Sequence, residues 1–135
     1  NKVKHCLPLF DYIHSLDNIK LADKIANEQV KKNFKPKIFL QINIGDEQQK
    51  SGIDFKDTEN LYSKIKNDFD LDIVGLMCIP PNVSNTKPFF EKMNQISKIL
   101  NLNELSMGMS NDYLDAAKNS ATFVRIGSKI FGERI

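Results

Sequence analysis

The chain has 135 residues, of which 41% are hydrophobic and 27% are charged, with a formal net charge of +2. This composition is typical of one soluble globular domain. The lysines are scattered along the chain, which argues against a nucleic-acid-binding surface. No apolar run approaches the roughly 20 residues needed to cross a bilayer. Cys6 and Cys78 lie far apart without metal-ligand spacing, so we expect a reduced, cytoplasmic protein with no metal site and no membrane contact.

Strand and helix patterns alternate along the chain. Apolar runs predict strands at residues 12–16, 37–44, 73–79, 105–107 and 123–126. Helical spacing of apolar residues predicts helices at 18–30, 57–67, 88–100 and 112–119. Asp17 is the expected N-cap of the first helix.

This alternation predicts an α/β fold with a parallel sheet. An open five-stranded sheet is possible, but the loops favour a closed (β/α)8 barrel, which takes about 250 residues when complete. The chain begins with Asn1, in the middle of a pattern. We therefore expect residues 1–135 to be one incomplete domain that holds about the last five β/α units and lacks the first three.

Two loops near the C-terminus form a candidate anion site. Residues 106–110 supply two hydroxyls and a glycine, and residues 125–132 supply a cation, a glycine and a hydroxyl before a short helical turn. Backbone N–H groups at helix starts bind anions, and barrels commonly bind phosphate after their last two strands. The alternative is that Gly108 and Gly127 only permit tight turns and that Ser110 caps a helix.

The same region resembles a known family. The segments 106–112, 116–117, 124–127 and 130–134, together with Thr122, are similar to the signature of the YggS family of pyridoxal phosphate homeostasis proteins. Their fold is the barrel of the alanine racemase N-terminal domain. The similarity covers nearly the whole chain, and counterparts occur at 14–17, 41–44, 50–52 and 75–77. Ser120 departs from the pattern, since the family usually has glycine there.

The resemblance implies a role for five residues. Ser110, Gly127 and Ser128 would hold the phosphate of pyridoxal 5'-phosphate, and Met109 would offer a backbone N–H. Arg125 would face the pyridine nitrogen. Because a guanidinium has no acceptor and keeps its proton, it would leave that nitrogen unprotonated and weaken the cofactor as an electron sink. The alternative for Arg125 is an ion pair inside the barrel.

The resemblance also implies a function. The family's Schiff-base lysine lies on an early strand outside this chain, so no catalytic residue is assigned. We expect a non-catalytic protein, monomeric when full length, that buffers pyridoxal phosphate or delivers it to apo-enzymes. The chain ends at Ile135, directly after the signature, which favours this function over an amino-acid racemase with an additional C-terminal domain. A third possibility is a barrel enzyme that binds another phosphorylated metabolite.

Four other side chains have more than one interpretation. His14, in the barrel wall, could stack near the cofactor, but a structural histidine is favoured. Cys78 lies in an apolar strand and is interpreted as a small hydrophobe. Lys129 is interpreted as neutralising phosphate, and Lys50 as a charge that faces solvent or the edge of a substrate.

Overall fold

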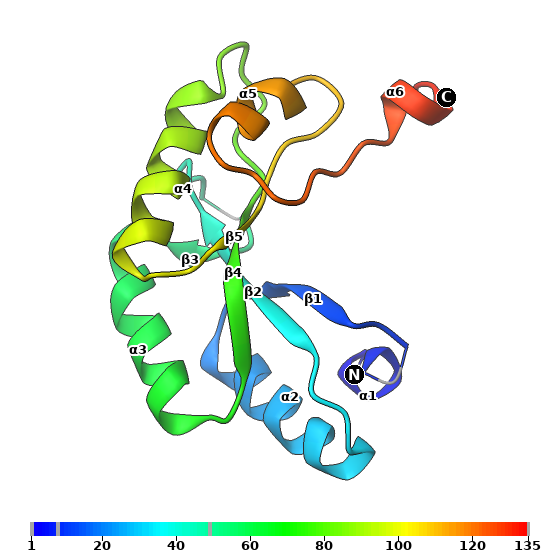
Figure 1. Cartoon of the computed structure of the whole chain (residues 1–135), viewed down its shortest axis with the longest axis vertical. Helices are drawn as coiled ribbons and strands as arrows, with labels where there is room; N and C mark the ends of the chain where they lie inside the picture. Colours follow the sequence, from blue (N-terminus) through cyan, green and yellow to red (C-terminus); the bar gives the residue numbers. More distant parts are fainter. Residues whose placement is uncertain (1, 8, 49, 135) are drawn as a thin grey trace.

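The computed structural model describes residues 2–7, 9–48 and 50–134. Strands and helices alternate along most of the chain (Figure 1). The elements are α1 (Val3–Cys6), β1 (Tyr12–Leu16), α2 (Ile19–Lys32), β2 (Lys37–Asn43), β3 (Ile53–Asp54), the 3-10 helix η1 (Phe55–Asp57), α3 (Thr58–Asp68), β4 (Asp72–Cys78), α4 (Lys87–Ile99), β5 (Glu104–Ser106), α5 (Tyr113–Lys118) and α6 (Ser128–Phe131). None of the helices in these ranges has both the length and the apolar character that a membrane crossing requires.

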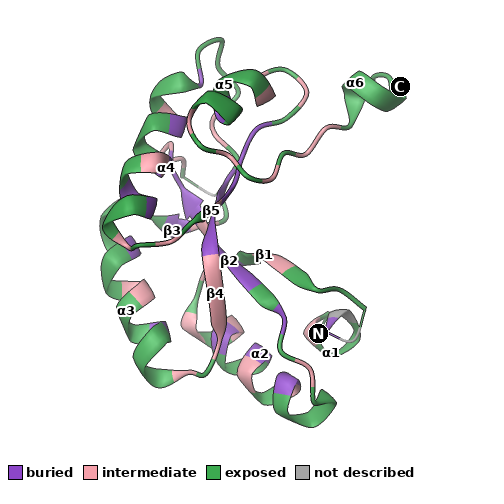
Figure 2. Cartoon of the chain, in the orientation of Figure 1, coloured by how far each residue is buried: buried purple, intermediate pink, exposed green. Residues whose placement is uncertain are grey.

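The strands form one parallel sheet in the order β1-β2-β4-β5, and the short β3 pairs with β2. Helices α2, α3 and α4 pack on one face, and the buried residues concentrate between them and the strands (Figure 2). That core consists mainly of aliphatic side chains, among them Ile25, Ile38, Leu40, Ile65, Leu76, Met93 and Leu105. The predicted α/β fold with a parallel sheet is therefore confirmed. We call the opposite face of the sheet its inner face.

Two irregularities decide which side chains reach the inner face. The register shifts between Ile13 and Leu16 in the β1–β2 pair, and beside Phe39 in the β2–β4 pair. An extra residue in a strand reverses the alternation of its side chains. Leu16 consequently packs into the helix-side core, whereas His14, two residues earlier, stacks on Phe39 at the inner face.

Some sequence-based predictions differ from the structure. Residues 123–126 do not form a regular strand, since only Phe123 makes a bridge, to Ser106. The short α1, β3 and η1 were not predicted. The N-cap of α2 is Asn18 rather than Asp17, because the Asn18 side chain accepts a hydrogen bond from the Leu21 N–H at 2.8 Å. The unpredicted elements have two to four residues, too short to leave a periodic pattern.

Ser120 occupies the turn between α5 and the Phe123 bridge in a left-handed conformation, with φ of 73°. Its N–H donates to the Ala117 carbonyl at 3.2 Å, so the turn is tightly closed. A residue with a Cβ is strained in this region, and glycine is not. This conformation gives a physical reason for the preference for glycine at this position.

We predict that Ser120→Gly stabilises the chain by up to about 1 kcal/mol, because relief of the left-handed strain outweighs the entropy that glycine loses on folding. Chemical denaturation measures the free energy of unfolding. Ser120→Ala is the matched control and should not stabilise the chain, because alanine keeps the Cβ. Equal stabilisation by both substitutions would contradict this explanation.

Candidate functional site

Two segments distant in sequence run side by side at the carboxyl end of β5. The Phe123 N–H donates to the Leu105 carbonyl at 3.0 Å, and the Met107 N–H donates to the Phe123 carbonyl at 3.1 Å. The Arg125 N–H continues this ladder to the Gly108 carbonyl at 2.9 Å. The ladder brings the loop after β5 next to the segment that leads into α6.

The two predicted phosphate-binding loops meet at Ser110. Its hydroxyl accepts a hydrogen bond from the Lys129 N–H at 3.1 Å, within the first turn of α6. Gly127 and Ser128 precede Lys129 and are exposed. Ser110 does not cap α5, because the N-cap position of that helix is Asp112. The structure therefore brings Ser110, Gly127 and Ser128 together.

The backbone of Met109 has a different partner. Its N–H donates to the Asp112 carboxylate at 2.8 Å, so the amide predicted to bind phosphate is held by an anion of the protein itself. Asp112 was not among the predicted site residues. An aspartate three residues after Met109, next to a predicted helix start, is the signal that could have identified it.

Gly108 allows α5 to approach this loop. Its φ is +101°, and a Cβ at this position would lie 2.7 Å from the Cβ of Ala116. Ala116 is fully buried, so the two backbones pack closely at this point, whereas Ala117 is exposed. A side chain at Gly108 would push α5 away from the loop.

Arg125 reaches from the ladder across to β4. One guanidinium nitrogen, Nη2, donates to the Cys78 carbonyl at 2.8 Å. The Nε and Nη1 atoms are buried, and neither has a hydrogen-bond partner in the part of the chain that the structure describes. The described residues also contain no ion pair to Arg125. Two buried donors of one cation thus remain available for an acceptor.

Burial shifts the titration of two groups here. It lowers the pKa of Arg125, while nearby Cys78 and Asp112 act in the opposite direction. Burial also raises the pKa of Cys78 to about 12. The Cys78 side chain is therefore a neutral thiol packed in the helix-side core, as expected for a small hydrophobe rather than a nucleophile.

An aromatic layer lies on the inner face: Tyr12, His14, Phe39 and Phe123. Phe123 contacts Tyr12 and Phe39 at centroid distances of 5.3 and 5.4 Å, and His14 stacks on Phe39 at 4.3 Å. His14 Nδ1 also lies 2.8 Å from the Ser106 hydroxyl. Burial, and secondarily the charge of Arg125, lower the pKa of His14. His14 is therefore a neutral, hydrogen-bonded part of the wall.

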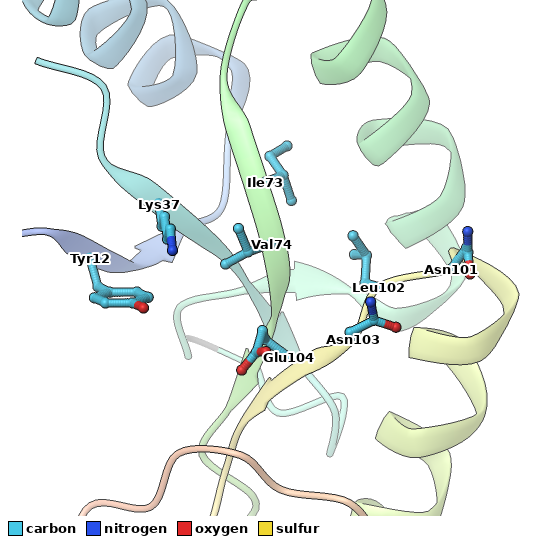
Figure 3. Close-up of a pocket in the computed structure, with 8 residues that line it drawn as sticks. All are labelled: Tyr12, Lys37, Ile73, Val74, Asn101, Leu102, Asn103 and Glu104. Atoms are coloured by element: carbon cyan, nitrogen blue, oxygen red, sulfur yellow. The ribbon is translucent and has the colours of Figure 1, made fainter.

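Among the hollows in the part of the chain that the structure describes, two lie at opposite ends of the sheet. One, of about 330 Å³, lies at the amino ends of the strands, where Tyr12, Lys37 and Glu104 line it (Figure 3). The other, of about 580 Å³, lies at the carboxyl ends and is lined by residues that include Lys50, Thr86, Met109 and Asp112. Parallel α/β sheets bind ligands at their carboxyl ends, so the second hollow adjoins the candidate site and the first does not.

Comparison with known proteins identifies the family. The profile of the family described as "Alanine racemase, N-terminal domain" matches residues 4–135. The chain belongs to the alanine racemase N-terminal domain family. This membership confirms the predicted type of barrel fold.

The chain is also similar to bacterial proteins named pyridoxal phosphate homeostasis protein. It is 36% identical to the one from Aquifex aeolicus, covering 99% of this chain and 63% of the relative. It is 39% identical to the one from Haemophilus influenzae, covering 99% and 61%. The predicted resemblance is therefore confirmed. The chain spans about three fifths of the length of these curated relatives.

Among solved structures, the chain is similar to PipY of Synechococcus elongatus. The form of PipY without PLP superposes with a TM-score of 0.88 at 30% identity, covering 98% of this chain and 66% of PipY. The form with PLP bound superposes with a TM-score of 0.86 at the same identity and coverage. The fold of this chain is therefore shared with a protein that has a solved structure with PLP bound.

We predict that Ser110→Ala loosens α6, because it removes the acceptor of the Lys129 N–H. The expected loss is about 0.5–1.5 kcal/mol for one net hydrogen bond. Amide hydrogen exchange measures it as faster exchange at Lys129. Ser128→Ala is the control, since that hydroxyl is exposed, and it should leave the Lys129 exchange rate unchanged. Unchanged exchange in Ser110→Ala would contradict the contact.

We predict that His14 makes the chain less stable as the pH falls below about 6.5. In the unfolded chain, His14 takes up a proton near the ordinary pKa of 6.5. In the folded chain its pKa is lowered, so it takes up the proton only at lower pH. Protonation therefore favours the unfolded state. Denaturation at pH 7.5 and 5.5 should give a smaller loss of stability for His14→Gln than for the wild type. His5→Gln, at an exposed position, should keep the wild-type loss.

Proposed function

We propose that this chain supplies the phosphate-binding side of a pyridoxal phosphate site, in a protein that buffers or delivers the cofactor without catalysing a reaction. The observation that carries the proposal is the guanidinium of Arg125, whose buried Nε and Nη1 have no partner among the described residues. Buried donors without an acceptor are costly. A ligand with an acceptor lone pair, such as a pyridine nitrogen, would satisfy one of them.

The phosphate end of the ligand has donors at a suitable place. Ser110 offers a hydroxyl, and Gly127 and Ser128 lie at the start of α6, where the first N–H groups have no acceptor within the helix. Met109 would offer its N–H once the Asp112 carboxylate releases it. The exposed Lys129 ammonium lies 3.2 Å from the Tyr113 hydroxyl, where it would add positive charge. Relatives named pyridoxal phosphate homeostasis protein support this assignment.

When bound, pyridoxal phosphate supplies an electron sink whose strength depends on its ring nitrogen. Arg125 would donate to that nitrogen and hold it unprotonated, since a guanidinium does not give up its proton. This arrangement weakens the sink and disfavours transaminase-like chemistry. It suits a protein that carries the cofactor in the cytoplasm and passes it to pyridoxal-phosphate-dependent apo-enzymes.

We predict that Arg125→Leu, in the protein as expressed from its own gene, weakens pyridoxal phosphate binding roughly tenfold or more, the value of one charge-assisted hydrogen bond. The absorbance of the bound cofactor should also shift, because its ring nitrogen loses a donor. Spectrophotometric titration measures both effects. Arg125→Lys keeps the positive charge but loses the planar set of guanidinium donors, so it should recover only part of the affinity.

Unchanged affinity and spectrum in Arg125→Leu would return Arg125 to a structural role. A sensitive racemisation assay with alanine on the wild-type protein separates carrier from enzyme. Measurable racemisation would replace the carrier with the amino-acid racemase. Failure of the wild type to bind pyridoxal phosphate would exclude both.

A further inference from the structure

The side chain of Asp112 faces the loop before its helix and not the helix itself. Asp112 holds the N-cap position of α5, yet its side chain makes no capping bond to that helix. The carboxylate turns back instead and accepts the Met109 N–H at 2.8 Å. An anion of the protein thus lies in the loop that is proposed to bind the anionic end of the cofactor.

The charge of Asp112 also extends into the site beyond this bond. Asp112 is half-buried, so its charge is only partly screened by solvent. Burial lowers the pKa of Arg125 and raises that of Cys78, and the charge of Asp112 opposes the first shift and adds to the second, so the carboxylate lies within electrostatic range of the guanidinium. Ser110 lies two residues away in the same turn. A phosphate at Ser110 would therefore feel the charge of Asp112 directly.

We propose that Asp112 is a positioning residue that keeps phosphate binding weak and reversible, by competing with the phosphate for the Met109 N–H and by repelling it. The inference rests on the proposed function and adds how affinity at that site is set. Both parts follow from simple electrostatics: two anions cannot share one amide donor, and like charges a few ångströms apart raise each other's free energy.

The competition has a consequence for release. When the phosphate leaves, the carboxylate takes back the Met109 N–H, so the amide does not remain without an acceptor. A protein that delivers its ligand gains from such an exchange, because release leaves no unsatisfied donor behind.

The test is isothermal titration of the protein, expressed from its own gene, with inorganic phosphate, pyridoxal phosphate and unphosphorylated pyridoxal. Asp112→Asn keeps an oxygen acceptor for the Met109 N–H and removes the charge. It should bind inorganic phosphate and pyridoxal phosphate roughly three- to tenfold more tightly, the effect of one nearby charge in a partly solvated site. Its affinity for pyridoxal should equal that of the wild type.

Two controls isolate the charge at this position. Asp115→Asn removes a negative charge from the same short helix, at an exposed residue, and should change phosphate affinity less than Asp112→Asn. Asp112→Glu restores the charge and should return phosphate affinity toward the wild-type value. In the wild type, the amide resonance of Met109 should move in NMR spectra when inorganic phosphate is added, a readout that requires no variant.

The outcomes separate the two proposals. If the wild type binds pyridoxal phosphate but Asp112→Asn is no tighter for phosphate, or is equally tighter for pyridoxal, the role of Asp112 is wrong and the proposed function stands. If the wild type binds neither inorganic phosphate nor pyridoxal phosphate, the proposed function and the role of Asp112 are both wrong. If Asp112→Asn fails to fold, an unmoved Met109 resonance overturns the inference, and a moved one supports it.

Discussion

The backbone ladder between residues 105–108 and 122–125 is the constraint on which the candidate site depends. It is made by bonds of 2.9 to 3.1 Å from the N–H groups of Phe123, Met107 and Arg125. The ladder fixes the direction of the Arg125 side chain and the distance from the β5 loop to α6. Only because this ladder is in register can the Ser110 hydroxyl accept the Lys129 N–H. A slip of one residue would turn Arg125 to the other face.

The curvature of the sheet is the second requirement. His14 on β1 and Ser106 on β5 are joined by a 2.8 Å contact, although β2 and β4 lie between their strands. In a flat sheet these strands would lie about 14 Å apart, so the contact requires a sheet that bends toward its inner face. Phe39 fills the space beneath this contact. The aromatic layer thus supports a wall that holds Arg125 over the inner face.

The sequence was sufficient for the order of the longer strands and helices, from β1 to α5, because long apolar strands and amphipathic helices leave periodic patterns. It was also sufficient to place Ser110 and Gly127 at one end of the sheet, since carboxyl ends of parallel strands share an edge. It was not sufficient for the bulges beside His14 and Phe39, because a bulge depends on pairing between strands. The contact of Asp112 was missed because its partner, the Met109 N–H, is a backbone group that every residue type provides, so only the aspartate itself, next to a predicted helix start, could have indicated it.

The site has hydrogen-bond donors without acceptors at Arg125 and an anionic acceptor, Asp112, where the phosphate is proposed to bind. Arg125 buries two donors that have no acceptor among the described residues, which costs stability. Asp112 adds an acceptor nearby but gives it to the Met109 N–H rather than to the guanidinium. A ligand with an acceptor at one end and an anion at the other would accept from Arg125. It would also have to displace the Asp112 carboxylate from the Met109 N–H. The affinity for the ligand then depends on the gain at Arg125 minus the cost at Asp112. A substitution at either residue changes one of these contributions without the other.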